Sequence, residues 1–168
     1  MSREGALLLI IGVTLVLIGL GVWGWRRRTR RDAAPLAPFG DLPVEATVRA
    51  TFDGFYVATT KHGEPLERVN APGLGFRSRA IVTVADMGVV LDLTGQDRIV
   101  LTTDRLADVA LSTVAIDRVV EKGGLVRLTW RALTGDLVDT YLRPQDASAR
   151  SLADAVRPLL STPTGSDA

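Results

Sequence analysis

An uncharged run from Gly5 to Trp25 constrains this chain of 168 residues more than any other feature. A helix over these 21 residues would be ~31 Å long, which matches the hydrocarbon core of a bilayer. Trp23 and Trp25 stand at its C-terminal end, where indole rings act as interfacial anchors. The run therefore predicts one transmembrane helix over residues 5–25, after an external N-terminus of residues 1–4.

Five arginines follow the apolar run: Arg26, Arg27, Arg28, Arg30 and Arg31. The positive-inside rule places this end in the cytoplasm, which predicts a single-pass protein of the cell membrane with its N-terminus outside. A cleavable signal peptide is the alternative, but its apolar core would be shorter and its basic residues would come first. The arginines are also candidates for contact with anionic membrane lipid, although setting the topology is their simpler role.

Three glycines, Gly5, Gly12 and Gly19, repeat every seven residues within the predicted span. Small residues on one helix face allow a second helix to approach closely. They form a candidate helix-packing face for a homo-oligomer, the alternative being the ordinary glycine content of membrane helices.

The rest of the chain divides by composition. Residues 26–43 combine the basic juxtamembrane segment with a linker that contains Pro35, Pro38 and Pro43, and proline disfavours helix there. A β-domain is expected over residues 44–160, and residues 161–168 form a polar tail that we expect to be disordered.

Alternating polar and apolar residues predict the strands of this domain. They are expected over residues 46–52, 55–60, 79–84, 88–93, 98–101, 114–120, 125–131 and 137–143, with a tight turn at Asp53-Gly54 and a loop from Lys61 to Gly75. An amphipathic helix is expected to begin after Asp146 or Ser148 and to run to about Leu160. About seven antiparallel strands in a bent barrel or sandwich, followed by one helix, is the order of a pleckstrin-homology (PH) domain.

Four short strings carry a resemblance to a known family: FYVATT (55–60), GLGFRSRA (73–80), the TW pair (129–130) and DTYLR (139–143). With them the chain resembles the small single-span, PH-like membrane proteins of high-GC Gram-positive bacteria. In the last string, Tyr141 and Leu142 stand where that family commonly has Gly and Phe. The resemblance implies the PH topology and no established biochemical activity.

Composition excludes several kinds of chemistry. The chain has no cysteine and one histidine, His62, so thiolate sites and paired-histidine metal sites are excluded. Residues 32–168 hold 14 basic and 18 acidic residues, a balance unlike that of a nucleic-acid-binding domain. Phosphate-binding glycine loops and nucleophile elbows are missing from the sequence. We therefore predict no catalytic, metal-binding or cofactor-binding residues, no cofactor and no enzymatic activity.

Two places remain as weaker candidates. His62 lies near Glu64 and Glu67, and we interpret it as a solvated loop residue rather than a catalytic base or a metal ligand. Arg77 and Arg79 alternate after Gly73 and Gly75. The glycines are expected to allow positive φ at the start of a strand, and the arginines are a candidate patch for binding an anionic group.

These observations favour a membrane-anchored, non-enzymatic PH-like module on the cytoplasmic face. Its expected role is protein–protein interaction within a membrane complex, because a tether raises its local concentration for such partners. A sensor of anionic lipid headgroups is the alternative function, and a membrane-proximal enzyme is a further one.

Overall fold

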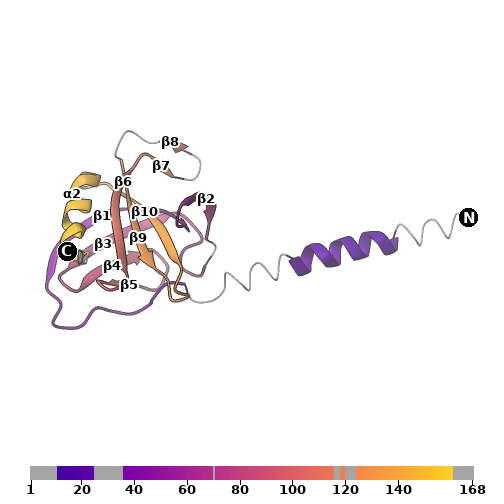
Figure 1. Ribbon diagram of the computed structural model, residues 1–168, viewed down its shortest axis with the longest axis horizontal. Coiled ribbons are helices and arrows are strands. Elements are labelled where there is room, and N and C mark those ends of the chain that lie inside the picture. The colour runs from indigo at the N-terminus through magenta and orange to yellow at the C-terminus, as the bar shows by residue number, and fades with distance from the viewer. Residues whose placement is uncertain (1–10, 25–35, 70, 116–117, 120–123, 161–168) are drawn as a thin grey trace, which may run out of the picture. The chain divides into compact units, whose positions relative to one another are not determined.

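The computed structural model describes residues 11–24, 36–69, 71–115, 118–119 and 124–160 (Figure 1). Residues 1–34 and 35–168 form two separate units. In the first unit, a helix covers residues 11–24 and its side chains are exposed.

The first unit requires a correction to the predicted fold. Within the described ranges, no helix has both the length and the apolar character needed to cross a membrane. A helix over residues 11–24 rises ~21 Å, whereas the hydrocarbon core of a bilayer is ~30 Å thick. The prediction of a transmembrane helix over residues 5–25 is therefore wrong. The predicted orientation depended on the arginines at positions 26–31, which lie outside the described residues.

The second unit is built on antiparallel strands. Its main sheet contains β1 (Val48–Lys61), β2 (Glu64–Arg68), β3 (Ser78–Ala85), β4 (Gly88–Leu93), β5 (Ile99–Thr102), β6 (Leu106–Ser112), β9 (Leu125–Arg131) and β10 (Leu137–Pro144). Their order is β5-β4-β3-β1-β10-β9-β6, and β2 pairs with β1. A separate ribbon pairs β7 (Val114–Ala115) with β8 (Arg118–Val119). In the described part of the chain, the main sheet thus has eight strands instead of about seven.

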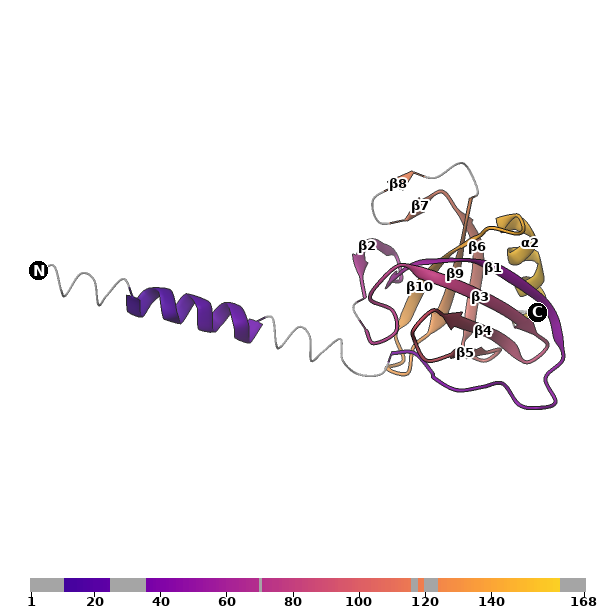
Figure 2. The ribbon, with the colours of Figure 1, turned by 180° about the vertical axis from the view of Figure 1, so that it is seen from behind.

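The long strand β1 joins two layers of the sheet. It pairs with β3 through residues 48–56 and with β10 through residues 54–61. Figures 1 and 2 show β3, β4 and β5 in one layer and β6, β9 and β10 in the other. The predicted turn at Asp53-Gly54 is wrong, because both residues lie inside β1. Glycine is needed at position 54 because a Cβ there would lie 2.4 Å from the carbonyl oxygen of Arg143.

Other strands agree with the sequence to different degrees. The predictions for β4 and β9 are confirmed at both ends. The strand expected over residues 114–120 is wrong, since the described part of this stretch holds only the short strands β7 and β8. The sequence did not indicate β6, because a register shift between Leu106 and Asp108 interrupts its polar–apolar alternation. It also missed β2, which lies inside the predicted loop.

Hydrophobic side chains fill the space between the two layers. The largest fully buried ones include Trp130, Tyr56, Leu91 and Leu128. A chain of hydrogen bonds crosses this core. The Tyr56 hydroxyl donates to the carbonyl oxygen of Leu74 (2.8 Å) and lies 3.0 Å from Oγ1 of Thr59. Burial raises the pKa of Tyr56 to about 12, because the charged phenolate would be poorly solvated there.

The same chain of hydrogen bonds continues into the second layer. Thr59 Oγ1 lies 2.8 Å from Thr140 Oγ1, which also accepts a hydrogen bond from Nε1 of Trp130 (2.8 Å). These buried polar groups satisfy one another, which removes the cost of withdrawing each of them from water.

The short helix α2 (Ala149–Val156) follows β10 and packs against β6 and β9. Ser148 is its N-cap, since its Oγ accepts a hydrogen bond from the backbone N–H of Ser151 (3.1 Å). The predicted apolar stripe is confirmed: Ala149, Leu152, Ala153, Val156 and, in the following 3₁₀ turn η1 (Arg157–Leu159), Leu159 are buried.

Residues 36–40, within the predicted linker, run along β5. The backbone N–H of Val100 donates to the carbonyl oxygen of Pro38 (2.8 Å), and that of Gly40 donates to the carbonyl oxygen of Arg98 (3.1 Å). Leu36 and Ala37 are buried in the core. This segment covers one edge of the sheet, which would otherwise present unpaired backbone groups.

Candidate functional site

Phe55 lies at the centre of a cluster of arginines on the outer face of the sheet. Residues 54–56 are the part of β1 that pairs with a strand on each side. Within them, Gly54 has no side chain and Tyr56 points into the core. Phe55 is therefore the position at which an outward side chain of β1 has cross-strand neighbours on both sides.

Both cross-strand neighbours of Phe55 are arginines. It pairs with Arg79 on β3 and with Arg143 on β10, and directly paired residues have Cβ atoms ~5 Å apart on one face. A third arginine, Arg77, places its guanidinium carbon 4.9 Å from the centroid of the Phe55 ring, within the range of a cation–π interaction. We call Phe55, Arg77, Arg79 and Arg143 the arginine–phenylalanine cluster.

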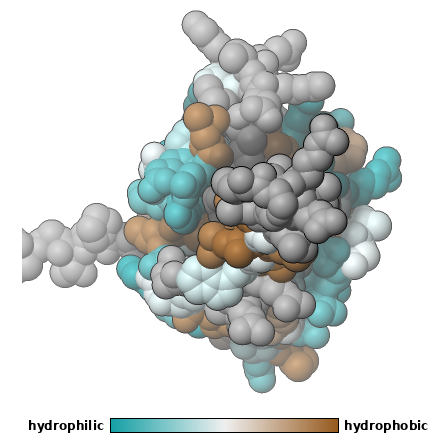
Figure 3. All heavy atoms as spheres, turned by 90° about the vertical axis from the view of Figure 1, so that its right-hand side faces the viewer, coloured by the Kyte–Doolittle hydropathy of each residue, from teal (hydrophilic) through white to brown (hydrophobic). Residues whose placement is uncertain are grey.

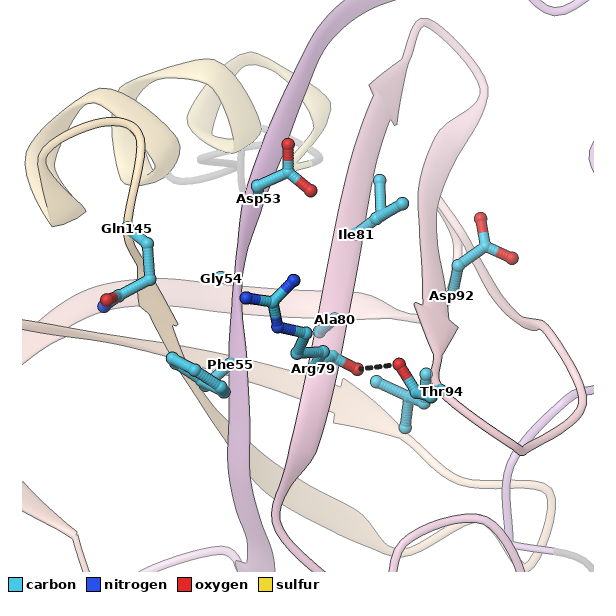
Figure 4. Close-up of a pocket in the computed structure, with 10 residues that line it drawn as sticks. Asp53, Gly54, Phe55, Arg79, Ala80, Ile81, Asp92, Thr94 and Gln145 are labelled. Atoms are coloured by element: carbon cyan, nitrogen blue, oxygen red, sulfur yellow. Dashed lines mark hydrogen bonds between the residues drawn. The ribbon is translucent and has the colours of Figure 1, made fainter.

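A hollow of about 590 Å³ adjoins this cluster. Figure 4 shows Asp53 and Phe55 on β1, Arg79 and Ile81 on β3, Asp92 on β4, and Gln145 after β10 around it. The guanidinium of Arg79 extends toward β1, between Asp53 and Phe55. The segment after β10 is held in place by a hydrogen bond from the backbone N–H of Gln145 to the carbonyl oxygen of Asp53 (2.8 Å).

Some of the charged side chains around the hollow have an ion-pair partner, and others do not. Asp92 accepts a hydrogen bond from Nε of Arg98 (2.6 Å), and Arg98 also pairs with Asp41. The hydrogen bond with Asp92 is the largest cause that raises the pKa of Arg98, followed by that with Asp41. By contrast, the guanidinium groups of Arg79 and Arg143 have no hydrogen bond or ion pair with the described residues. The cluster therefore carries uncompensated positive charge.

Phe76 directly precedes Arg77 in the chain and is 85% exposed. It belongs to the segment that leads into β3, in which Gly73 has a positive φ of 81°. The expectation of positive φ is confirmed for Gly73 and wrong for Gly75. Together with the half-buried Phe55, Phe76 adds aromatic surface to a basic region.

The sequence of residues 35–157 matches the family described as Bacterial PH domain-like. The chain belongs to this family. The match confirms the PH-like resemblance drawn from the sequence, and it does not bear on a single membrane span or on high-GC Gram-positive bacteria. No curated protein matches the sequence.

In this bacterial PH-like domain, the structure brings Arg77 and Arg79 of the predicted patch to one side of the sheet and adds two members. Arg143 and Phe55 were missed as site residues, although both lie in strings that carry the family resemblance. Their role depends on strand register, since Phe55 and Arg143 meet only through the pairing of β1 with β10. No local spacing could have indicated this.

The other predicted site residues belong to the first unit. Trp25, Gly5 and the five arginines (Arg26, Arg27, Arg28, Arg30 and Arg31) lie outside the described residues. Trp23 is exposed on the helix over residues 11–24. A Cβ at Gly12 or Gly19 would meet nothing within 4 Å, so self-association through this face stays a prediction.

The single histidine has a partner that the sequence did not indicate. Nδ1 of His62 lies 2.9 Å from Oδ1 of Asp139, a residue that is 2% exposed. The same carboxylate oxygen accepts a hydrogen bond from Oγ1 of Thr129 (2.6 Å). Glu67, one of the two acids near His62 in sequence, instead pairs with Lys61. His62 is exposed in the turn after β1, as expected of a solvated loop residue, and it also contacts a buried carboxylate that the sequence did not indicate.

The surface shows where hydrophobic groups are exposed. On the face in Figure 3, the coloured hydrophobic atoms form separate small groups among hydrophilic ones. Separate groups of this kind are ordinary for a folded domain. The combination of Phe76 with the arginine–phenylalanine cluster differs from them, because it adds concentrated positive charge to the exposed aromatic surface.

Proposed function

We propose that this chain is a non-enzymatic module that binds a partner protein through the arginine–phenylalanine cluster and Phe76. The family's fold suggests an interaction module. The observation that carries the proposal is the grouping of three arginines around Phe55, with Phe76, which is 85% exposed, one residue before Arg77 in the chain. Aromatic residues and arginine are the types most enriched among residues that dominate binding energy at protein interfaces.

The predicted position on the cytoplasmic side of a membrane depended on the spanning helix and is not part of this proposal. The absence of catalysis remains part of it. Nδ1 of His62 is engaged by Asp139, and neither residue lines the hollow beside the cluster. The hollow offers one guanidinium (Arg79), two carboxylates (Asp53 and Asp92), an aromatic ring and aliphatic side chains, which are groups suited to recognition.

Anionic lipid is the other class of partner that the arginines suggest. A flat lipid surface would approach the whole outer face, where Asp53, Asp146 and Gln145 are exposed beside the arginines. Exposed carboxylates close to the cations oppose the approach of a negatively charged sheet. This local mixture of charges favours a protein partner, which can place opposite charges individually.

Site-specific photo-crosslinking tests the proposal. A photoreactive phenylalanine analogue is introduced at position 76 in the full chain, and a matched one at Leu133, which is 47% exposed on the same domain. We expect a discrete protein adduct in cells of the source organism from position 76 and none from position 133. The adduct should weaken when Arg77→Ala or Arg79→Ala is added.

Two outcomes contradict the proposal. One is an identical set of adducts from positions 76 and 133, which would indicate random collisions. The other is the absence of protein adducts at position 76, combined with flotation of the full chain on phosphatidylserine-containing vesicles that Arg79→Ala abolishes. That second outcome would support the lipid alternative.

A further inference from the structure

The hollow beside the arginine–phenylalanine cluster has the size and the chemistry to receive individual side chains. Its volume of about 590 Å³ is within the range of sites that hold small ligands or a few side chains. Arg79 lines it with no ion pair among the described residues, and Ile81, two residues further along β3, is 44% exposed in it. A cation and an aliphatic group therefore alternate along one strand.

This alternation matches the geometry of an extended peptide. Residues two apart on a strand point to the same face and are separated by ~6.6 Å. An extended segment along β3 would thus place one side chain over Arg79 and the next on the same face over Ile81. A carboxylate is the group that a guanidinium binds best, through two parallel hydrogen bonds, and an aliphatic side chain is the natural neighbour of Ile81.

The charge of the surroundings also selects an acidic segment. Arg77 and Arg143 add two further cations around Phe55. The carboxylate of Asp92 is already engaged by Arg98, so Asp53 is the one acid lining the hollow that lacks a cationic partner among the described residues. Arg77, Arg79 and Arg143 thus outnumber the exposed carboxylates of Asp53 and Asp146 beside them. Acidic side chains placed individually over the arginines, away from these two carboxylates, would complement the net positive charge.

We propose that this hollow binds an extended, acidic segment of the partner protein in which acidic and aliphatic residues alternate. The inference rests on the proposed function and specifies the chemistry of the partner. An acidic side chain pairs with Arg79, an aliphatic side chain packs on Ile81, and further acidic residues lie near Arg77 and Arg143. A concave site of this kind favours a peptide over a bilayer, whose flat surface cannot enter the hollow.

Fluorescence anisotropy with synthetic peptides tests the inference on the full chain in a mild nonionic detergent. The probe is a short labelled peptide of alternating Glu and Leu, and its matched control carries Gln in place of every Glu. We expect the Glu peptide to bind at least about tenfold more tightly, because charge-assisted hydrogen bonds to arginine are stronger than neutral ones. Its affinity should fall as salt is added.

Variants locate the binding site. Arg79→Ala and Arg143→Ala should each weaken binding of the Glu peptide by about tenfold, the effect of removing one charged hydrogen-bonding group. Arg131→Ala is the matched control, since Arg131 is an exposed arginine at the end of β9 far from Arg143. Among the described residues, its guanidinium bonds only the carbonyl oxygen of Gly135 (2.9 Å). The Arg131→Ala variant should bind the Glu peptide as tightly as the unmodified chain does. Circular dichroism of each variant verifies that the domain is folded.

Equal affinities for the Glu and Gln peptides would overturn the inference, and so would retention of Glu-peptide binding in both Arg79→Ala and Arg143→Ala. Crosslinking at position 76 separates this failure from failure of the proposed function. If a protein adduct forms there while the Glu and Gln peptides bind alike, the module binds a protein of different chemistry. If the chain binds phosphatidylserine-containing vesicles but not the Glu peptide, the arginines serve a lipid surface.

Discussion

Nδ1 of His62 lies 2.9 Å from Oδ1 of Asp139, a residue 77 positions further along the chain whose carboxylate is buried. Thr129 donates a second hydrogen bond to the same oxygen. Asp139→Ala would leave these donors without their acceptor, and we expect it to lower the free energy of unfolding by about 2–3 kcal/mol. Urea unfolding followed by circular dichroism measures the change.

Asp136→Ala is the control for this prediction, because Asp136 is an exposed aspartate whose carboxylate bonds only Thr134 among the described residues. It should change the free energy of unfolding by less than about 0.5 kcal/mol. Equal losses in the two variants would show that the buried carboxylate has no special role in stability.

Gly54 provides a steric prediction. Gly54→Ala would place a Cβ 2.4 Å from the carbonyl oxygen of Arg143 and 2.9 Å from Cα of Pro144, so β1 and β10 would have to separate. We expect a loss of about 2 kcal/mol or more, at the upper end of overpacking effects. Gly75→Ala, where a Cβ meets nothing within 4 Å, should be neutral or stabilising by up to about 1 kcal/mol. Thermal unfolding of both variants in parallel compares them, and a Gly54→Ala protein as stable as Gly75→Ala contradicts the described approach of the strands.

The raised pKa of Tyr56 predicts that the domain loses stability at alkaline pH. Its pKa is raised to about 12 by burial, whereas a tyrosine in the unfolded chain titrates near 10. Between pH 10 and 12 the native state therefore keeps a proton that the unfolded state has lost. The contribution of Tyr56 to the free energy of unfolding is fully present below pH 10. It falls by about 2–3 kcal/mol as the pH rises to 12.

Tyrosinate absorbance measures this titration directly. The chain has two tyrosines, and burial also raises the pKa of Tyr141, so Tyr141→Phe is used to isolate Tyr56. In that variant we expect the absorbance of the folded protein to rise well above pH 10. A midpoint near 10, with the circular dichroism spectrum unchanged, would disprove the buried position of Tyr56.

Ser148 provides a test of the C-terminal helix. Ser148→Ala removes the side chain that accepts the N–H of Ser151 and should destabilise the domain by about 1 kcal/mol, whereas Ser148→Asp preserves a capping oxygen. Chemical unfolding of the two variants measures the difference. If both substitutions cost the same, Ser148 does not act through its cap.

The sequence predicted those elements whose pattern is local and unbroken. β4 is a short, nearly continuous apolar run, β9 alternates from Val126 to Arg131, and the apolar stripe of α2 has regular helical spacing. By contrast, the bulge after Leu106 concealed β6. Asp53-Gly54 has the composition of a turn, but a glycine is needed there because a neighbouring strand passes close to the backbone. The neighbouring strand is β10, and the sequence around Gly54 does not show that β10 packs there.

The residues of the candidate site also divide into those that a local string indicates and those that only the strand pairing brings together. Arg77 and Arg79 were found because they lie in one distinctive string. Arg143 joins them through the register of β1 with β10, and His62 finds its acid on β10 and not among its sequence neighbours. Contacts between residues this far apart in the chain depend on topology, which one sequence read by itself does not specify.

The shared strand β1 also constrains when this domain can mature. Its first half pairs with β3, which follows it closely in the chain, but its second half pairs with β10, which comes after all the other described strands. The two layers therefore cannot close until the ribosome has synthesised β10. Until then the second half of β1 has unpaired backbone hydrogen-bonding groups along one edge. Unpaired strand edges make a nascent chain prone to aggregation, which chaperones prevent.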